Sequence, residues 1–324
     1  FNASTLPKKN VSGTYNIAGT YCVLANKMPE REGSIQLLLH GLAYTKEYWN
    51  GIKYPNTTFP GEFSWVHHAT AQGYSTLAID NLGNGDSDFP DPINTVQLPL
   101  QLEVIREIIK GLRSQSFSCI QAKYNKVIFV THSYGSLVGR AMAQDYPNPA
   151  DGADAYILTA SSTNLVGIKA AGANFRPRAA SIQNPKRFGH LPPAYVHMDP
   201  TALREIVYSL KGEYDPGMLA WDMMQPHSFA IGELATFKKN DTSEFAGPVM
   251  YLTGRIDAIV CDAAGNTTIS IPNCGVRRSS NPGLSVERFP RAKPFGVYVP
   301  DQTGHNLNLG YSAPETFGAV NQFL

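Results

Sequence analysis

The sequence lacks any long hydrophobic run. Its longest apolar stretches, such as residues 35–39 and 127–130, have the length of a buried strand, whereas a membrane-spanning helix needs ~20 apolar residues. Charge is scarce as well: only 16% of the residues are charged, with 27 basic against 26 acidic. This balance gives no electrostatic reason to expect nucleic acid or an anionic membrane as a partner. Hydrophobic residues make up 43% of the chain, which is enough for a sizeable core.

Cysteine is also sparse, and no His/Cys cluster has the spacing of a zinc site. The four cysteines are Cys22, Cys119, Cys261 and Cys274. An even number fits two disulfides in an oxidising compartment, and four reduced, buried thiols are the alternative. Cys261 and Cys274 share one irregular stretch, so we predict that they pair; closing a loop of about 14 residues contributes ~3 kcal/mol in the chain-entropy model. Cys22 and Cys119 then pair with each other or stay free.

Five Asn-x-Ser/Thr sequons favour secretion, because chance alone accounts for fewer in a chain of this length. The chain also begins at Phe1 rather than at Met, as the numbering of a processed or trimmed form would. Together with the cysteines, these features predict a secreted, extracellular glycoprotein. The sequons are at Asn2, Asn10, Asn56, Asn240 and Asn266.

Strand-like and helix-like segments alternate along most of the chain. The predicted strands are largely apolar runs rather than alternating ones, which is typical of parallel strands covered on both faces. This pattern predicts an α/β fold with a doubly wound, mostly parallel sheet. An antiparallel hairpin is expected before it, at residues 13–24. The predicted strands cover residues 34–40, 75–80, 126–131, 155–159, 249–253 and 294–299, and the main helices cover 96–112, 134–146 and 313–324.

One long segment, residues 164–244, has no strong strand pattern. Its helical stretches, such as 200–210 and 216–224, are separated by proline-rich turns. We therefore predict a helical insertion between a first core part, residues 1–163, and a second, residues 245–324. Two interpretations of its bulky apolar side chains stay open: they line an apolar substrate pocket, or they pack the insertion onto the core. The pocket candidates are Tyr214, Met218, Trp221 and Phe229.

The sharpest local signal for chemistry is at Ser133. A short apolar strand runs into it, and the small residues Gly135 and Ser136 follow where a helix is predicted to begin. Such a strand–turn–helix lifts a serine hydroxyl above the carboxyl end of a sheet. The usual pattern is G-x-S-x-G, but Thr131 replaces the first glycine here. An ordinary turn between a strand and a helix is the alternative interpretation.

A nucleophilic serine needs a base, and the base needs a group that orients it. His305 follows the last predicted strand and Asp257 follows the one before it, so the chain order is serine, acid, histidine. Asp262 and Asp301 are rival acids, whereas the other possible acid position, after the strand 155–159, holds no carboxylate. A plain surface histidine is the alternative for His305. We predict His305 as the general base and Asp257 as its orienting acid.

An oxyanion hole needs two backbone N–H groups aimed at the developing negative charge. The N–H of Tyr134, directly after the nucleophile, is one candidate. The N–H of Leu42 is the other, because Gly41 lets the backbone turn towards the site after the strand 34–40. A simple strand-ending turn at His40 and Gly41 is the alternative.

These motifs together resemble the α/β-hydrolase superfamily over nearly the whole chain, residues 15–324. Residues 80–87, DNLGNGDS, are similar to that family's D-x-x-G-x-G-x-S loop. The resemblance implies that the helical insertion is a cap domain. Family members that open epoxides or remove halogens carry Asp at the nucleophile position, and Ser133 argues against both activities. With its sequons and cysteines, the chain is similar to secreted fungal members.

The resemblance implies hydrolysis of a carboxylic ester or lactone of a hydrophobic substrate through an acyl-enzyme, with no metal or organic cofactor. An acyltransferase or cyclase of natural-product biosynthesis would use the same three residues, with an alcohol or amine in place of water. A non-catalytic binding protein on the same scaffold is the third possibility. The expected partner is a small molecule, and the sequence carries no signal for an oligomeric state.

Overall fold

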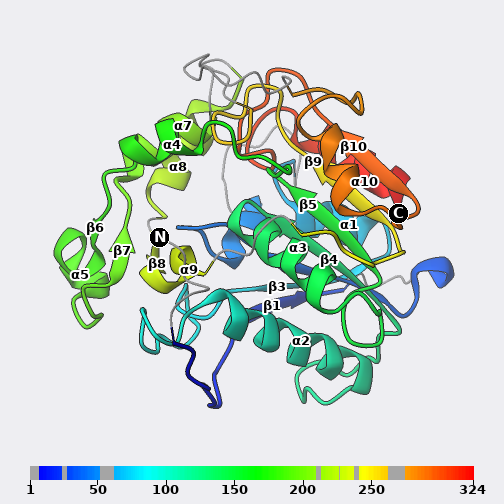
Figure 1. The fold of residues 1–324 in the computed structure, drawn as a ribbon, viewed down its shortest axis with the longest axis horizontal. Helices are drawn as coiled ribbons and strands as arrows, with labels where there is room; N and C mark the ends of the chain where they lie inside the picture. The colour runs from blue at the N-terminus through cyan, green and yellow to red at the C-terminus, as the bar shows by residue number, and fades with distance from the viewer. Residues whose placement is uncertain are drawn as a thin grey trace.

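A seven-stranded sheet lies at the centre of the computed structural model, in the order β1-β3-β2-β4-β5-β9-β10 (Figure 1). β1 pairs antiparallel with β3, and the other neighbouring strands are parallel. The predicted mostly parallel sheet is therefore confirmed. The strands are β1 (Gly19–Cys22), β2 (Ser34–Leu39), β3 (Ser75–Ile79), β4 (Lys126–His132), β5 (Ala155–Thr159), β9 (Val249–Leu252) and β10 (Phe295–Tyr298). The structure describes residues 7–23, 28–51, 62–208, 213–225, 227–236, 241–261 and 274–324.

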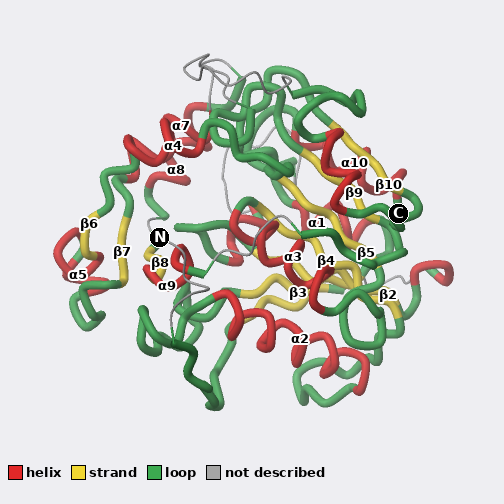
Figure 2. The backbone as a smooth tube through the Cα atoms, viewed as in Figure 1, coloured by secondary structure: helices red, strands yellow, loops and turns green. Residues whose placement is uncertain are grey.

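Helices cover both faces of the sheet (Figure 2). Successive side chains on a strand point to opposite faces. Leu38 therefore joins the core under α1 and α10, while Leu37 joins the core under α2 and α3. Because both faces are covered, β2 is buried along its whole length and β4 along all but its first residue. These helices are α1 (Trp65–Ala71), α2 (Leu98–Ser114), α3 (Tyr134–Asp145) and α10 (Ala313–Phe323).

The chain leaves the sheet after β5 and returns at β9, and we call the segment between them the cap. It lies to one side of the sheet, at the left of Figure 1. Among the described residues, no helix of cap or core is long and apolar enough to cross a membrane. The elements of the cap are α4 (Ile168–Asn174), β6 (Arg178–Ala179), α5 (Ala180–Gln183), α6 (Pro185–Phe188), β7 (Tyr195–His197), α7 (Pro200–Tyr208), α8 (Pro216–Met223), β8 (Ser228–Ala230) and α9 (Ile231–Ala235).

Two expectations about strands were wrong. The cap is not purely helical, because β6, β7 and β8 form a small antiparallel sheet. Each of these strands has only two or three residues, too few for an alternating pattern to show in the sequence. Of the expected hairpin at residues 13–24, the described residues form a single strand, β1, whose partner is β3. Local sequence contains no information about a partner that lies so far along the chain.

The cysteines form one disulfide, between Cys261 and Cys274, whose Cα atoms lie 5.5 Å apart. Cys22 and Cys119 are both free, so the second pairing that the even count suggested is wrong. The alternation of side chains along β1 explains this. Cys22 packs against the core under α1 and α10, whereas Phe117, near Cys119, packs against the core on the opposite face of the sheet.

We expect the disulfide to stabilise the loop that carries the candidate acid. The N–H of Cys261 donates to the carbonyl of Asp257 at 2.8 Å. Replacing Cys261 and Cys274 together by serine is expected to lower the free energy of unfolding by up to about 3 kcal/mol, measured in urea. Cys119→Ser, at a free and exposed thiol, is the control and is expected to change little. Free thiol at both Cys261 and Cys274 in a non-reducing peptide map would contradict the pairing.

Candidate active site

Ser133 lies in a sharp turn between β4 and α3. Its backbone has φ +54° and ψ −115°, a conformation that a residue with a side chain adopts only under strain. The surrounding structure holds this turn, because the N–H of Ser133 donates to the carbonyl of Thr159 at the end of β5 at 3.0 Å. The side chain is half-buried. The turn thus presents a serine hydroxyl at the carboxyl edge of the sheet, as the sequence predicted.

Small residues are required around this turn. A Cβ atom at Gly135 would lie 2.6 Å from the carbonyl oxygen of His40, and one at Gly41 would lie 2.9 Å from the Cβ of Ser133. Thr131 replaces the usual first glycine without an unpaired hydroxyl, since its Oγ1 donates to Ser136 Oγ at 3.1 Å. The departure from the family pattern is therefore accommodated by one buried hydrogen bond.

The structure brings Ser133, His305 and Asp257 together. His305 Nε2 lies 2.7 Å from Ser133 Oγ, and His305 Nδ1 lies 2.8 Å from Asp257 Oδ2. A carboxylate only accepts hydrogen bonds, so the proton is on Nδ1 and the free Nε2 accepts from the serine hydroxyl. The histidine follows β10 and the acid follows β9. The three side chains reach one point because parallel strands end at one edge of the sheet.

Asp257 is held in the charged form. Its Oδ1 accepts from the N–H groups of Ile259 and Val260, at 2.8 and 2.9 Å, and its Oδ2 accepts from Thr253 Oγ1 at 3.1 Å. Full burial by itself would raise the pKa of Asp257. The positive charge that His305 carries when it is protonated, its hydrogen bond and those from the N–H groups of Val260 and Ile259 outweigh the burial, so the pKa of Asp257 lies below its ordinary value.

The rival acids occupy other positions. Asp301 is exposed and forms an ion pair with Arg255 on the surface. Asp262 lies outside the described residues. Of the carboxylates that the structure describes, Asp257 is the one hydrogen-bonded to His305.

His132 is part of the site, and the sequence analysis did not single it out. Its ring lies 5.2 Å from that of His305 and is stacked on Tyr48 at 4.2 Å. Its Nδ1 lies 3.1 Å from both Tyr48 Oη and Thr159 Oγ1. Burial, followed by the charge of His305, moves the pKa of His132 well below its ordinary value. A neutral, fixed imidazole therefore packs behind the candidate base. No sequence motif distinguishes such a residue from any other histidine beside a serine.

The loop that carries Leu42 turns towards Ser133 directly after β2. His40 holds the start of this loop in place. The Nε2 of His40 accepts from the N–H of Asn81 at 3.1 Å, and the Nδ1 of His40 lies 2.7 Å from the carbonyl of Gly41. Leu42 is half-buried. Tyr134, the other oxyanion candidate, begins α3 directly after Ser133, where a helix N-terminus favours negative charge.

The D-x-x-G-x-G-x-S segment supports the same loop. Asp80 is fully buried, and its carboxylate accepts from the N–H and the Nζ of Lys46, at 2.7 and 2.6 Å. It also accepts from the N–H of Asp86 at 3.0 Å. Gly85 has φ +57°, and a Cβ there would lie 2.2 Å from this carboxylate. The motif is therefore structural: it fastens the loop after β3 to the end of the loop that bears Leu42.

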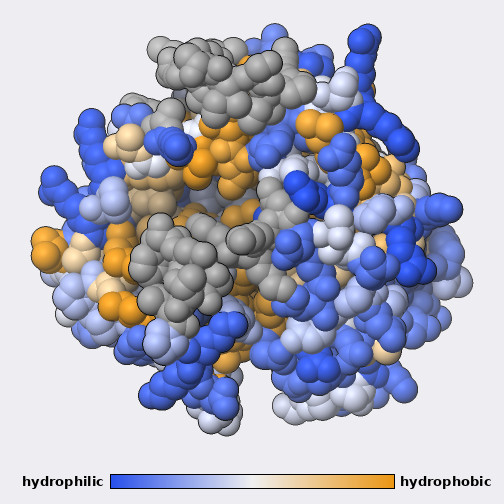
Figure 3. Space-filling model, in the orientation of Figure 1, coloured by the Kyte–Doolittle hydropathy of each residue, from blue (hydrophilic) through white to orange (hydrophobic). Residues whose placement is uncertain are grey.

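The four pocket candidates fall into two groups. Met218 and Phe229 expose 0% and 2% of their surfaces, so in this structure they pack the cap onto the core. Tyr214 and Trp221 are partly buried and lie against the same hydrophobic cluster, as does Leu42. On the face drawn in Figure 3, hydrophobic residues gather in the hollowed part of the surface on the side of the cap.

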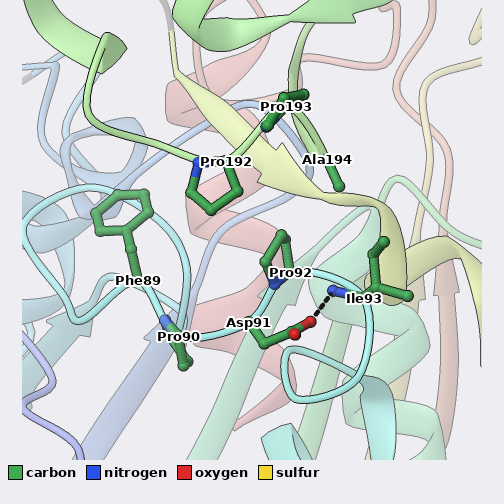
Figure 4. Close-up of a pocket in the computed structure, with 8 residues that line it drawn as sticks. All are labelled: Phe89, Pro90, Asp91, Pro92, Ile93, Pro192, Pro193 and Ala194. Atoms are coloured by element: carbon green, nitrogen blue, oxygen red, sulfur yellow. Dashed lines mark hydrogen bonds between the residues drawn. The ribbon is translucent and has the colours of Figure 1, made fainter.

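A separate cavity of about 580 Å³ lies at the seam between core and cap (Figure 4). Core residues 89–93 line one side of it and cap residues 192–194 line the other, and prolines from both segments face each other across it. Its one carboxylate, that of Asp91, accepts from the N–H of Ile93 at 2.8 Å. None of the three candidate catalytic residues lines it, so it is separate from the candidate active site.

Comparison with known proteins identifies the family of the chain. The alpha/beta hydrolase family model matches residues 36–320, and the chain therefore belongs to this family. No curated protein matches the sequence.

Several solved structures have a similar fold at low sequence identity. A thermophilic esterase from Thermogutta terrifontis is 14% identical, with a TM-score of 0.63, and the match covers 97% of this chain and 95% of that one. A monoglyceride lipase variant from Saccharomyces cerevisiae is 14% identical with a TM-score of 0.63, covering 99% and 96%. An N-acyl homoserine lactone degrading enzyme is 16% identical with a TM-score of 0.59, covering 96% and 97%. At such identities the likeness concerns the fold.

Proposed function

We propose that this protein is a serine hydrolase that cleaves carboxylic esters or lactones of a hydrophobic substrate through an acyl-enzyme. The observation that carries the proposal is the hydrogen-bond chain from Ser133 through His305 to Asp257, at 2.7 and 2.8 Å. A nucleophile, a base that contacts it and a buried acid that orients the base are the parts that acyl transfer requires. The fold is one that an esterase, a monoglyceride lipase and a lactone-degrading enzyme also have, so it is compatible with hydrolysis of an ester or lactone.

In this mechanism Ser133 Oγ attacks the carbonyl carbon while His305 Nε2 takes its proton. The imidazolium keeps its Nδ1–H bond to Asp257, whose charge stabilises it. The N–H groups of Leu42 and Tyr134 receive the oxyanion, and each such donor is worth ~2.7–4 kcal/mol in the transition state. His305 then protonates the leaving alkoxide, which leaves the acyl group on Ser133. A water molecule repeats both steps and releases the acid.

The hydrophobic character of the substrate follows from the side chains around the site. Leu42, Tyr214 and Trp221 are partly buried against one cluster that joins cap and core, and they would contact an acyl or alcohol group above Ser133. Acyl transfer or cyclisation would use the same residues, and it differs only in which nucleophile reaches the acyl-enzyme.

Secretion is part of the proposal. The disulfide Cys261–Cys274 fits an oxidising compartment, and Asn10, the sequon that lies within the described residues, is exposed. The sequons at Asn2, Asn56, Asn240 and Asn266 lie outside those residues. Glycan mapping of the natively produced protein tests this part separately.

Covalent labelling tests the catalytic proposal. A fluorophosphonate is expected to modify one site per chain, in the peptide that contains Ser133. p-Nitrophenyl esters of graded acyl length, together with lactones, are expected to give turnover that the same reagent blocks. Protein that is neither labelled nor active on any of these substrates would contradict the hydrolase proposal. If the acyl group were transferred to an added alcohol or amine faster than it is hydrolysed by water, the acyltransferase alternative would be favoured instead.

A further inference from the structure

A buried polar junction lies beside the candidate active site, and its parts come from distant segments of the chain. Tyr44 closes the turn after β2, where its N–H donates to the carbonyl of Gly41 at 3.3 Å. Asp222 lies on α8 of the cap, and Asn306 directly follows His305. Tyr44, Asp222 and Asn306 expose 6%, 2% and 3% of their surfaces, so water cannot readily replace their contacts. We call these three residues the Tyr44 junction.

The phenol of Tyr44 joins the other two side chains. It donates to Asp222 Oδ2 at 3.0 Å and accepts from Asn306 Nδ2 at 2.6 Å. Asp222 Oδ2 also forms an ion pair with Arg204 Nε of α7 at 2.8 Å, and the guanidinium of Arg204 lies 4.2 Å from the centre of the Tyr44 ring. A phenol has a single proton, so a carboxylate on one side and an amide donor on the other fix its orientation.

A second contact holds the loop of His305 and Asn306 to the cap. The N–H of Asn306 donates to the carbonyl of Val207 in α7 at 3.0 Å. The main chain next to His305 is thus bonded to the cap, and the side chain of Asn306 is bonded to Tyr44. Because Leu42 shares its turn with Tyr44, the junction connects the candidate base, the candidate oxyanion loop and the cap.

We propose that Tyr44 is a positioning residue for catalysis: its hydroxyl holds the His305 loop and the Leu42 turn in their relative positions while Asp222 of the cap is docked against it. Tyr44 acts through these loops and does not touch the reacting atoms. Turnover then depends on docking of the cap, although all three candidate catalytic residues belong to the core. This inference rests on the proposed function, because it assumes that His305 is the base.

Tyr44→Phe tests the inference with the smallest change. It removes the hydroxyl and keeps the ring that contacts Tyr48 and Arg204. We expect kcat for a p-nitrophenyl ester to fall about 10- to 100-fold with KM little changed, because a misplacement of about 1 Å has an effect of this size. Asn306→Leu removes the other end of the bond and is expected to act in the same way. The double variant is expected to resemble Tyr44→Phe, since the loss of the Tyr44 hydroxyl already removes its bond to Asn306.

Tyr195→Phe is the matched control. Tyr195 is a fully buried tyrosine of the cap, and its hydroxyl donates to the carbonyl of Pro90 in the core at 2.8 Å. This contact lies beside the seam drawn in Figure 4, whose lining includes no candidate catalytic residue. The variant loses one cap–core hydrogen bond donated by a buried phenol, and it is expected to keep its kcat.

Hydrogen exchange supplies a readout that does not depend on catalysis. We expect faster exchange at the amides of residues 41–46 and 303–309 in Tyr44→Phe, and unchanged exchange there in Tyr195→Phe. Equal kcat and equal exchange in the two variants would overturn the inference, as would losses that multiply in the Tyr44→Phe/Asn306→Leu variant. If the wild-type protein shows neither ester turnover nor fluorophosphonate labelling, the proposed function fails, and exchange still decides whether Tyr44 holds the two loops.

Discussion

Ser133→Ala is expected to abolish ester turnover and to leave the fold intact. The substitution removes the atom that would form the acyl-enzyme, and the loss of such a nucleophile lowers kcat on the order of 10⁶-fold. The fold is expected to persist because the Ser133 hydroxyl caps no N–H of α3, and because the bond that holds the turn comes from the main-chain N–H to Thr159. The measurements are kcat on the best p-nitrophenyl ester and the thermal unfolding midpoint.

Ser162→Ala is the matched control for this experiment. Ser162 is another serine at the carboxyl edge of the sheet, after β5; it is fully buried, and its hydroxyl donates to the carbonyl of Asn164. Its removal is expected to lower the free energy of unfolding by about 1 kcal/mol and to leave the turnover of the folded protein unchanged. If Ser133→Ala kept more than a few per cent of the wild-type rate, the nucleophile would have to be another residue.

The core of the fold could be predicted from the sequence because its signals are local. The central parallel strands β2, β4, β5 and β9 are buried on both faces, so each appears as a short, mostly apolar run, such as residues 34–39. The serine turn is also local, since strand, serine and small residues follow one another. Asp257 and His305 are far from Ser133 in sequence, but the carboxyl ends of β9 and β10 place them at the edge where β4 ends. The parallel topology of the sheet therefore made it possible to predict that these two residues lie near Ser133.

The unpaired Cys22 and the contact between Tyr44 and Asp222 could not be predicted, because they depend on long-range contacts that leave no local pattern in the sequence. The free state of Cys22 depends on which face of the sheet it points to, and that depends on the pairing of β1 with β3. Tyr44 and Asp222 are 178 positions apart in the chain. Nothing near either residue indicates that the phenol of the core meets a carboxylate and a guanidinium of the cap. Such a cluster forms only when the cap is folded against the core.

Asp257→Asn is expected to lower kcat roughly 10⁴-fold through the wrong tautomer of His305. In the wild-type protein, two N–H groups donate to Asp257 Oδ1. In the variant the amide oxygen would occupy that position, because the amide nitrogen would face two donors there. The amide nitrogen then faces His305 Nδ1 and donates to it. The imidazole proton moves to Nε2, which can no longer accept the proton of Ser133.

Asp301→Asn is the control, because Asp301 precedes His305 on the same loop and is exposed; its kcat is expected to stay at the wild-type value. Acid unfolding gives a second readout of Asp257→Asn. The pKa of Asp257 is lowered in the folded protein, so its charge contributes stability above about pH 4 that is lost as the pH falls through the folded-state pKa. The amide variant lacks this component, and its stability is expected to fall less steeply in that range. If Asp262→Asn proved the damaging change and Asp257→Asn did not, the acid would be Asp262.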